Sequence, residues 1–353
     1  MKKFISRFVL VILPLLCIPI VNYTIDPSHI YDHYEQKIVS LLQHHPYVIN
    51  VDQNMDERSF KKTLIDSCKT DIDMLIFGSS SVMSISESMF EGKHILNLGM
   101  SGATYEDIAA LLYHYLSTGK CPRAVILGID PQHFNANIGD TRWKTLQNEY
   151  AAYSKEVLSK PMYQLPDFEK WFNLLSLTYF QCCLKFDGDQ YAIQTIDSVI
   201  HSDDIEHGAG LCKDGSLVYG RAFNNLSLQE TNELAKNEAY SQWDNYAELS
   251  PIEIERWQQF IRYLQKKGIE VYIYESPYHP ITFKRLNDEE RYEMMETAMN
   301  YVDQFAEENT LMVIGSYNPS QCNLQECDFY DGTHVRKEHV AKLMESIFTN
   351  EVE

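Results

Sequence analysis

Positive charge is scarce in this chain of 353 residues. Lysine and arginine total 30, against 50 aspartates and glutamates, so the formal net charge is −20 at pH 7. An acidic surface repels the phosphate backbone of a nucleic acid. The composition therefore argues against nucleic acid as a partner.

Metal-binding spacings are missing as well. The sequence contains neither Cys-x-x-Cys nor His-Glu-x-x-His, so it gives little support for a structural or catalytic zinc, and we expect no cofactor. Eight cysteines are too few for a dense disulfide scaffold at this length. Cys322 and Cys327 are close enough in sequence to pair if the body is exported, but the sequence does not determine which cysteines bridge.

A signal-peptide cleavage site is also lacking. Two lysines and an arginine precede an uncharged apolar run over 8–21, and bulky residues follow it where a cleavage site needs small ones. Counted from residue 4, the run approaches the roughly 20 residues that span a membrane. As a soluble helix it would be damaged by Pro14 and Pro19. We therefore expect an uncleaved transmembrane anchor over 4–21, with the N-terminus in the cytoplasm and the body outside.

No internal repeat or low-complexity tract is evident, and 44% hydrophobic residues can bury a sizeable core. Short apolar runs alternate with amphipathic stretches, which is typical of a parallel sheet covered by helices. The predicted fold class is therefore α/β, with three α/β/α layers and a mainly parallel sheet. Strands are expected at 74–77, 94–98, 124–127, 269–275 and 310–315. Helices are expected at 57–68, 105–117, from 251 to the glycine at 268, at 288–307 and after 334.

The same pattern divides the chain into four parts. Residues 1–22 are the anchor, and 23–70 are a stalk and a leading helix. The α/β domain takes 71–135 and 250–350. Residues 136–249 break the alternation, with many aromatic and turn residues, and are expected to form an insertion or cap over the sheet.

Four polar motifs stand at the ends of predicted strands. They are "GSSS" (78–81), "NLGMSG" (97–102), "LGIDPQHF" (127–134) and "DFYDGTH" (328–334). Alone, "GSSS" reads as a turn or a helix cap. In a parallel sheet, however, all four would emerge at one edge, where open α/β sheets place their chemistry.

The residue types suit nucleophilic catalysis. A serine hydroxyl becomes a good nucleophile when a histidine takes its proton and an acid orients that histidine. Asp331 and His334, three residues apart, supply an acid and a base. Backbone N–H groups at Ser80 and in the loop that ends at Gly102 are candidates for stabilising an oxyanion.

This set of motifs, in this order, resembles the SGNH (GDSL-like) hydrolase superfamily, whose fold is flavodoxin-like. The resemblance implies that Ser80 is the nucleophile, that His334 and Asp331 complete a triad, and that Gly102 donates to the oxyanion. One block departs from the family pattern: Asp130 stands where relatives commonly have an asparagine. Either its carboxyl is protonated, or it points elsewhere, or a neighbour such as Asn135 or Gln132 supplies the missing donor.

An anchor joined to such a domain is similar to alginate-type O-acetyltransferases and to proteins of lipoteichoic acid D-alanylation. The resemblance implies a membrane-anchored, extracytoplasmic serine esterase or O-acyltransferase that acts on acyl groups, with acetyl expected, of a cell-surface polysaccharide. A membrane-bound acyltransferase is an implied partner. Two alternatives stay open: a catalytically weak SGNH-fold module that binds a polymer, or a structural protein that assists an acyltransferase or export complex.

Four further residues are candidates for contact with substrate. Asp130 and His279 follow predicted strands, and Arg221 and Trp143 lie in the predicted insertion, where they are suited to hydrogen bonding and to stacking on a sugar. Packing or solvation explains His279 equally well, and explains Arg221 and Trp143 better.

Overall fold

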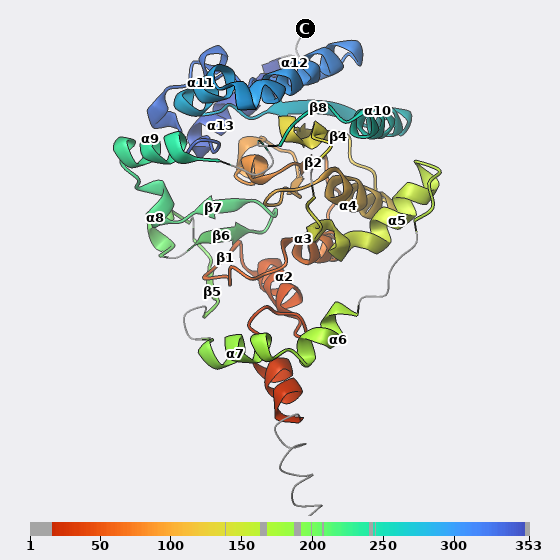
Figure 1. The fold of residues 1–353 in the computed structure, drawn as a ribbon, viewed down its shortest axis with the longest axis vertical. Helices are drawn as coiled ribbons and strands as arrows, with labels where there is room; N and C mark the ends of the chain where they lie inside the picture. The colour runs from red at the N-terminus through yellow and green to blue at the C-terminus, as the bar shows by residue number, and fades with distance from the viewer. Residues whose placement is uncertain are drawn as a thin grey trace, which may run out of the picture.

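The computed structural model describes residues 16–349 apart from 138, 163–167, 187–191, 199, 207, 240–242 and 244. Two sheets organise this part of the chain (Figure 1). The larger has five parallel strands, which confirms the predicted α/β class. Their order across the sheet is β3 (Ile95–Asn97), β2 (Met74–Phe77), β4 (Ala124–Gly128), β8 (Glu270–Glu275) and β9 (Met312–Gly315).

This order is 2-1-3-4-5 when the five strands are counted along the chain, which is one of the two common orders of doubly wound sheets. The strand order reverses between β2 and β4, whose residues pair in parallel from Met74 opposite Ala124 to Phe77 opposite Leu127. Ligands of such sheets bind beyond the carboxyl ends of the strands at this point. The segments that follow β2 and β4 are therefore the place to look for a site.

Both faces of the parallel sheet are buried. Alternate residues of β2 and β4, such as Leu75 and Val125, belong to one apolar cluster, and their neighbours Ile76 and Ile126 belong to another. Side chains alternate across a strand, so the two clusters lie on opposite faces. Helices contribute to both clusters, which is consistent with three α/β/α layers.

The described helices have the following bounds. They are α2 (Tyr34–His44), α3 (Glu57–Ser67), α4 (Tyr105–Ser117), α5 (Gln147–Glu156), α6 (Glu169–Leu174), α7 (Leu177–Lys185), α8 (Arg221–Asn224), α9 (Leu228–Asn237), α10 (Pro251–Lys266), α11 (Pro280–Asp288), α12 (Glu293–Glu308), α13 (Lys337–Met344) and α14 (Ser346–Thr349). The helix predicted at 105–117 is α4. The helix predicted at 288–307 is wrong at its start, because α11 ends at Asp288 and a tight turn separates it from α12.

The smaller sheet is antiparallel, in the order β5 (Gln194–Ile196), β1 (Tyr47–Ile49), β6 (Ala209–Cys212) and β7 (Leu217–Tyr219). β1 comes from the predicted stalk and the other three strands come from the predicted insertion. Figure 1 shows this sheet at the level of α2 and α3, below the parallel sheet. The two segments thus fold together, and α2 and α3 contribute to the main core.

Residues 16–25 are helical, and the remainder of the predicted anchor lies outside the described residues. Within the described residues, no helix has the length and hydropathy needed to cross a bilayer. All eight cysteines of the chain are unpaired, including Cys322 and Cys327.

Lys61 of α3 joins the two sheets. Its ammonium is fully buried and donates to the carbonyl oxygens of Asn97, at the end of β3 (3.0 Å), and of Gly215, in the β6–β7 turn (2.6 Å). Burial lowers the pKa of Lys61 to about 8, against a smaller opposing effect of Glu57 and Asp214. The bonds are strong, but the charge is held far from water.

We predict that Lys61 makes stability depend on pH above neutrality. The folded chain releases this proton near pH 8, whereas an unfolded lysine keeps it to about pH 10.4. Between these values the unfolded state holds more protons, so the free energy of unfolding attributable to Lys61 rises with pH, by up to about 1.4 kcal/mol per pH unit.

The measurement is urea unfolding of the full chain between pH 7 and 10, for the wild type and Lys61→Met. The free energy of unfolding of the wild type, relative to that of Lys61→Met, should increase as the pH rises. Lys62→Met, at the neighbouring half-exposed lysine, is the matched control. A difference that stays constant across this range would contradict the prediction.

Candidate functional site

Three side chains from two distant segments of the sequence are joined in series by hydrogen bonds. The Nε2 atom of His334 lies 2.8 Å from the Oγ atom of Ser80, and its Nδ1 atom lies 2.7 Å from Oδ2 of Asp331. Ser80 and His334 are 254 residues apart in sequence. This is the nucleophile, base and acid arrangement of a serine hydrolase.

The Asp331 carboxylate is fixed by its own turn. Its Oδ1 atom accepts hydrogen bonds from the backbone N–H groups of Thr333 and His334, both at 2.8 Å. Burial alone would raise the pKa of Asp331, but the charge on His334 and these hydrogen bonds outweigh it and lower the pKa. The carboxyl is therefore held ionised beside the imidazole.

The interaction between Asp331 and His334 also shifts the pKa of His334, in the upward direction. Burial alone would lower the pKa of His334, but the Asp331 carboxylate raises it on balance, with smaller contributions from Glu238 and Asp130. The Asp331 carboxylate thus favours the protonated form of the imidazole.

A sharp turn after β2 presents Ser80. Gly78 has φ of +152°, and a Cβ atom there would lie 3.0 Å from the carbonyl oxygen of Gly128, so the turn requires glycine. Ser79 accepts a hydrogen bond from the backbone of Ser81, and their hydroxyl oxygens lie 3.2 Å apart. Of the three serines, Ser80 is the one that contacts His334.

Asn97 holds the Ser80 turn against the next motif. Its side-chain amide donates to the carbonyl oxygens of Val82 (2.7 Å) and Ile85 (2.8 Å), and its Oδ1 atom accepts from the N–H of Gly99 (2.8 Å). The segment that follows Ser80 and the loop 97–102 are therefore one unit. The sequence placed Asn97 in a motif but did not predict this role.

Gly102 ends that loop with φ of +54°, and its carbonyl oxygen accepts from the guanidinium of Arg142 at 3.3 Å. In the described part of the chain, no acceptor is found for the backbone N–H of Ser80 or of Gly102. Their role as oxyanion donors stays a prediction.

Asp130 follows β4, at the point where the strand order reverses. Its Oδ2 atom is buried and, among the described residues, has no hydrogen-bond partner. Asp130, Gly102, Asn135 and Trp143 line a small cavity of about 130 Å³. This cavity therefore brings together four of the residues that the sequence selected.

His133, which the sequence analysis did not select, supports that cavity. Its Nε2 atom lies 2.9 Å from the carbonyl oxygen of Ala103, and its Nδ1 atom accepts from the N–H of Asp130 at 3.2 Å. One nitrogen must donate and the other must accept, so the ring is neutral.

The predicted role of His279 in substrate binding is not supported. The side chain is fully buried, and its Nδ1 atom caps α11 by accepting from the N–H of Ile281 at 3.1 Å. His279 is thus the N-cap residue of α11, with Pro280 at the first helical position.

Arg221 and Asn135 have different surroundings. Arg221 is exposed at the first position of α8. Asn135 is buried, and its Oδ1 atom accepts from the N–H of Asn137 at 2.9 Å.

Two aromatic residues of the insertion lie beside the imidazole instead. The rings of Tyr219 and Phe223 have their centroids 6.0 Å and 6.2 Å from that of His334, and both rings are half-buried. The sequence analysis missed them because Tyr219 ends β7 and Phe223 lies on α8, so no regular strand or helix spacing links the two rings.

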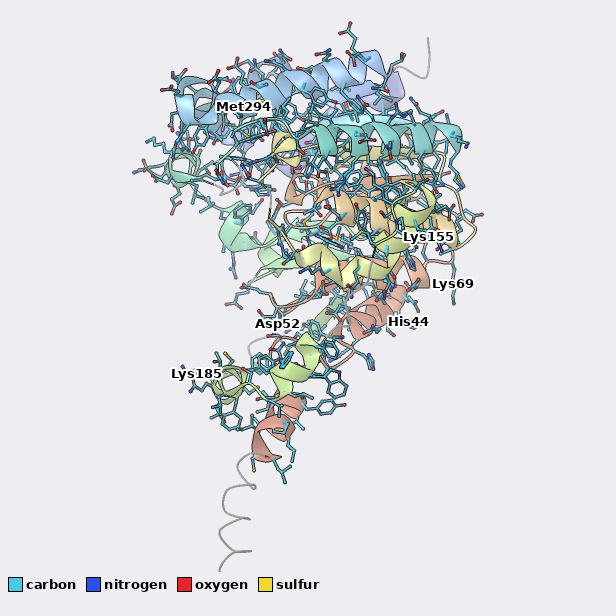
Figure 2. All side chains as sticks on the ribbon, turned by 45° about the vertical axis from the view of Figure 1, so that its right-hand side comes forward. His44, Asp52, Lys69, Lys155, Lys185 and Met294 are labelled. Carbon is cyan, nitrogen blue, oxygen red and sulfur yellow. The ribbon has the colours of Figure 1, made fainter. Side chains whose placement is uncertain are left out.

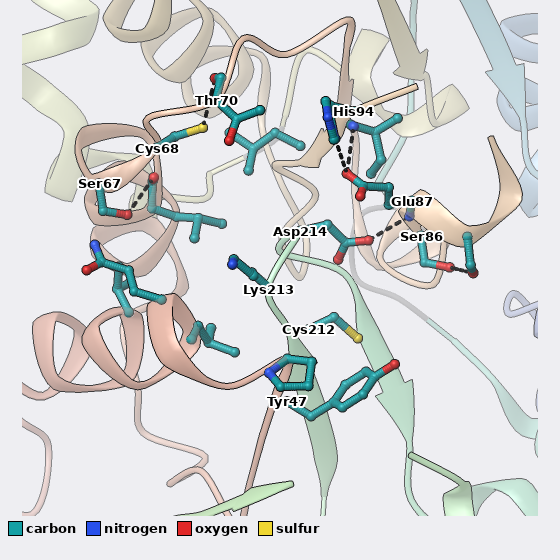
Figure 3. Close-up of a pocket in the computed structure, with 18 of the residues that line it drawn as sticks. Tyr47, Ser67, Cys68, Thr70, Ser86, Glu87, His94, Cys212, Lys213 and Asp214 are labelled. Carbon is teal, nitrogen blue, oxygen red and sulfur yellow. Dashed lines mark hydrogen bonds and ion pairs between the residues drawn. The ribbon is translucent and has the colours of Figure 1, made fainter. Parts of the chain in front are cut away.

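A larger cavity, of about 850 Å³, lies elsewhere, between α2, α3, β3 and the small sheet (Figure 3). None of Ser80, Asp331 and His334 lines it. Within the described residues, no group of three or more His, Cys, Asp or Glu side chains could hold a metal ion. No protein-family model matches the chain, and no curated protein matches it.

We predict that the Asp331 carboxylate sets the titration of His334. In the wild-type chain the pKa of His334 should lie above the ordinary value of about 6.5. Asp331→Asn removes the charge that raises it, and the pKa should then fall. NMR titration of the imidazole measures both values. Asp328→Asn, which alters the carboxylate paired with His339 at 3.2 Å, is the matched control. An equal fall in both variants would exclude a specific effect of Asp331.

Proposed function

We propose that this protein is a serine esterase or O-acyltransferase of the SGNH type. The observation that carries the proposal is the hydrogen-bonded chain from Ser80 through His334 to Asp331, with distances of 2.8 Å and 2.7 Å. The doubly wound strand order and the position of Ser80 directly after β2 support the same fold type.

The proposed chemistry has two halves. The Ser80 oxygen attacks the carbonyl carbon of an ester while His334 takes the hydroxyl proton, and the leaving alcohol then receives that proton as the ester C–O bond breaks. An acceptor, either water or a sugar hydroxyl, next gives its proton to His334 and attacks the acyl-serine. Its oxygen takes the acyl group, and His334 returns the proton to Ser80. The N–H groups of Ser80 and Gly102 would stabilise the negative oxygen in both halves.

The substrate that we propose is an acyl ester, with acetyl favoured, on a cell-surface glycan. The half-buried rings of Tyr219 and Phe223 next to His334 are suited to contact with a sugar ring. The proposed setting is the outer face of the cytoplasmic membrane, with residues 4–21 as a single-pass anchor, on the evidence of the charges that precede the apolar run. A membrane-bound acyltransferase is the proposed partner.

One observation favours a second candidate function. Asp130 stands where proteins of this type commonly carry an asparagine, and its buried Oδ2 atom has no hydrogen-bond partner within the part of the chain that the structure describes. An ionised carboxyl aimed at the oxyanion would oppose catalysis. A module that binds a polymer without turning it over, or that assists an acyltransferase, would tolerate this residue.

A serine-directed fluorophosphonate probe separates the two candidates. We expect labelling of the full chain and its complete loss in Ser80→Ala, since Ser80 is the serine bonded to His334. Ser79→Ala and Ser81→Ala are matched controls from the same turn and should stay labelled. Turnover of an acetyl ester should fall by several orders of magnitude in Ser80→Ala. Absence of labelling in the wild-type chain would favour the binding module.

We further predict that Asp130→Asn preserves or raises the rate of ester turnover. The change supplies an amide donor and removes a negative charge near the oxyanion. Because the buried Oδ2 atom has no described partner, no hydrogen bond to it is lost. The measurement is kcat/KM for an acetyl ester, with retention of the fold checked by circular dichroism. A large fall in a folded variant would mean that the carboxylate itself takes part.

A further inference from the structure

Large apolar side chains are exposed on α6, α7 and the residues next to them. Six of these side chains have 59–72% of their surface exposed: Phe168, Trp171, Phe172, Leu175, Leu177 and Leu184. We call these six residues the apolar collar. Soluble proteins seldom leave such side chains gathered on one surface, and where they do the surface contacts a partner or a membrane.

The collar is joined to the helix that leads out of the predicted anchor. The side-chain amide of Asn22 is fully buried and donates to the carbonyl oxygens of Asn173, Leu174 and Ser176, each at 3.0 Å. These carbonyls belong to the end of α6 and to the connection to α7, so the attachment lies at the centre of the collar.

Three further hydrogen bonds strengthen this attachment. The hydroxyl of Tyr179 donates to Asp26 at 2.6 Å and accepts from the N–H of Ser28 at 3.2 Å. The hydroxyl of Tyr31 donates to the carbonyl oxygen of Lys170 at 2.6 Å. The collar is therefore held firmly against the N-terminal segment.

The helix over residues 16–25 exposes apolar side chains at the same end of the molecule. Leu16, Ile20 and Tyr23 are 55–61% exposed. Figure 1 shows α6 and α7 beside this helix, at the opposite end of the molecule from α12, and Figure 2 shows the charged side chain of Lys185 at that end. The exposed apolar side chains of the N-terminal helix and those of the collar thus lie at the same end of the molecule.

The composition of the collar segment favours a lipid surface. Residues 168–186 contain one tryptophan, one tyrosine and four phenylalanines, and their charged residues are two lysines and one glutamate in a chain of net charge −20. Aromatic residues with lysines are typical of the membrane–water interface. α6 and α7 have six and nine residues, far too few to cross a bilayer.

We propose that the apolar collar lies in the interfacial layer of the membrane and holds the body at a fixed orientation beside the anchor. The proposal goes beyond the chemistry of Ser80 and does not depend on it. The alternative to lipid as the surface that the collar contacts is an apolar surface of a membrane-bound protein. Quenching by brominated lipid separates the two.

Trp171 is a natural reporter, because it is 68% exposed whereas Trp243 and Trp257 are buried. The full chain is reconstituted in vesicles of phosphatidylcholine and phosphatidylglycerol, with and without bromine on the acyl chains. Bromine quenches tryptophan that contacts the lipid. We expect quenching of part of the emission, and loss of the quenched part in Trp171→Phe. Trp143→Phe, a change at a half-buried tryptophan in another part of the insertion, should retain it.

Leu175→Asp places a charge in the collar and should reduce the quenching of Trp171 by at least about twofold. Leu228→Asp, at a half-exposed leucine of α9, is the matched control and should leave it unchanged. A chain that sediments with vesicles but shows no quenching of Trp171 would overturn the collar proposal alone and leave the surface for a protein partner. A chain that does not associate with vesicles would overturn the anchor and the collar together. Fluorophosphonate labelling reports separately on Ser80 in every variant.

Discussion

The buried ammonium of Lys61 donates to two carbonyl oxygens that lie 36 and 154 residues further along the chain. An unpaired charge in this position would be strongly destabilising, so α3, the end of β3 and the β6–β7 turn must meet at one place. Asn97 accepts one of these bonds through its backbone and holds the segment after Ser80 through its side chain. The orientation of the Ser80 turn is therefore tied to the contact between the two sheets.

Much of the parallel sheet could be predicted, because its signals are local. A strand buried on both faces is a short apolar run, and the run 74–77 agrees with β2 at both ends. Ser250 indicates the start of the helix at Pro251, because a serine there can cap the helix. Its hydroxyl accepts from the N–H of Glu253. Asp331 and His334 could be selected together because a spacing of three residues within one turn brings the carboxylate next to the imidazole.

The parts that could not be predicted depend on partners far away in the sequence. β1 pairs with β5 and β6, which lie in a segment that shows no regular alternation. Lys61 looks like a surface residue until its two acceptors are in place, although it shares a helix face with buried Ile65. His279 stands at a strand end, as a site residue would, yet its side chain is buried and caps α11. The local sequence cannot distinguish a side chain that caps a helix from one that binds substrate, because both roles use the same polar atom.

The separation of 254 residues between Ser80 and His334 also has a consequence during synthesis. The ribosome completes β2, β3 and β4 long before it reaches α13, so the nascent chain carries a serine with no base beside it. β1 likewise waits, with unpaired edges, until the residues of β5 and β6 emerge. The hydrogen bond between Ser80 and His334 can therefore form only after the C-terminal segment has been synthesised, and β1 gains its partners only after β5 and β6 have emerged.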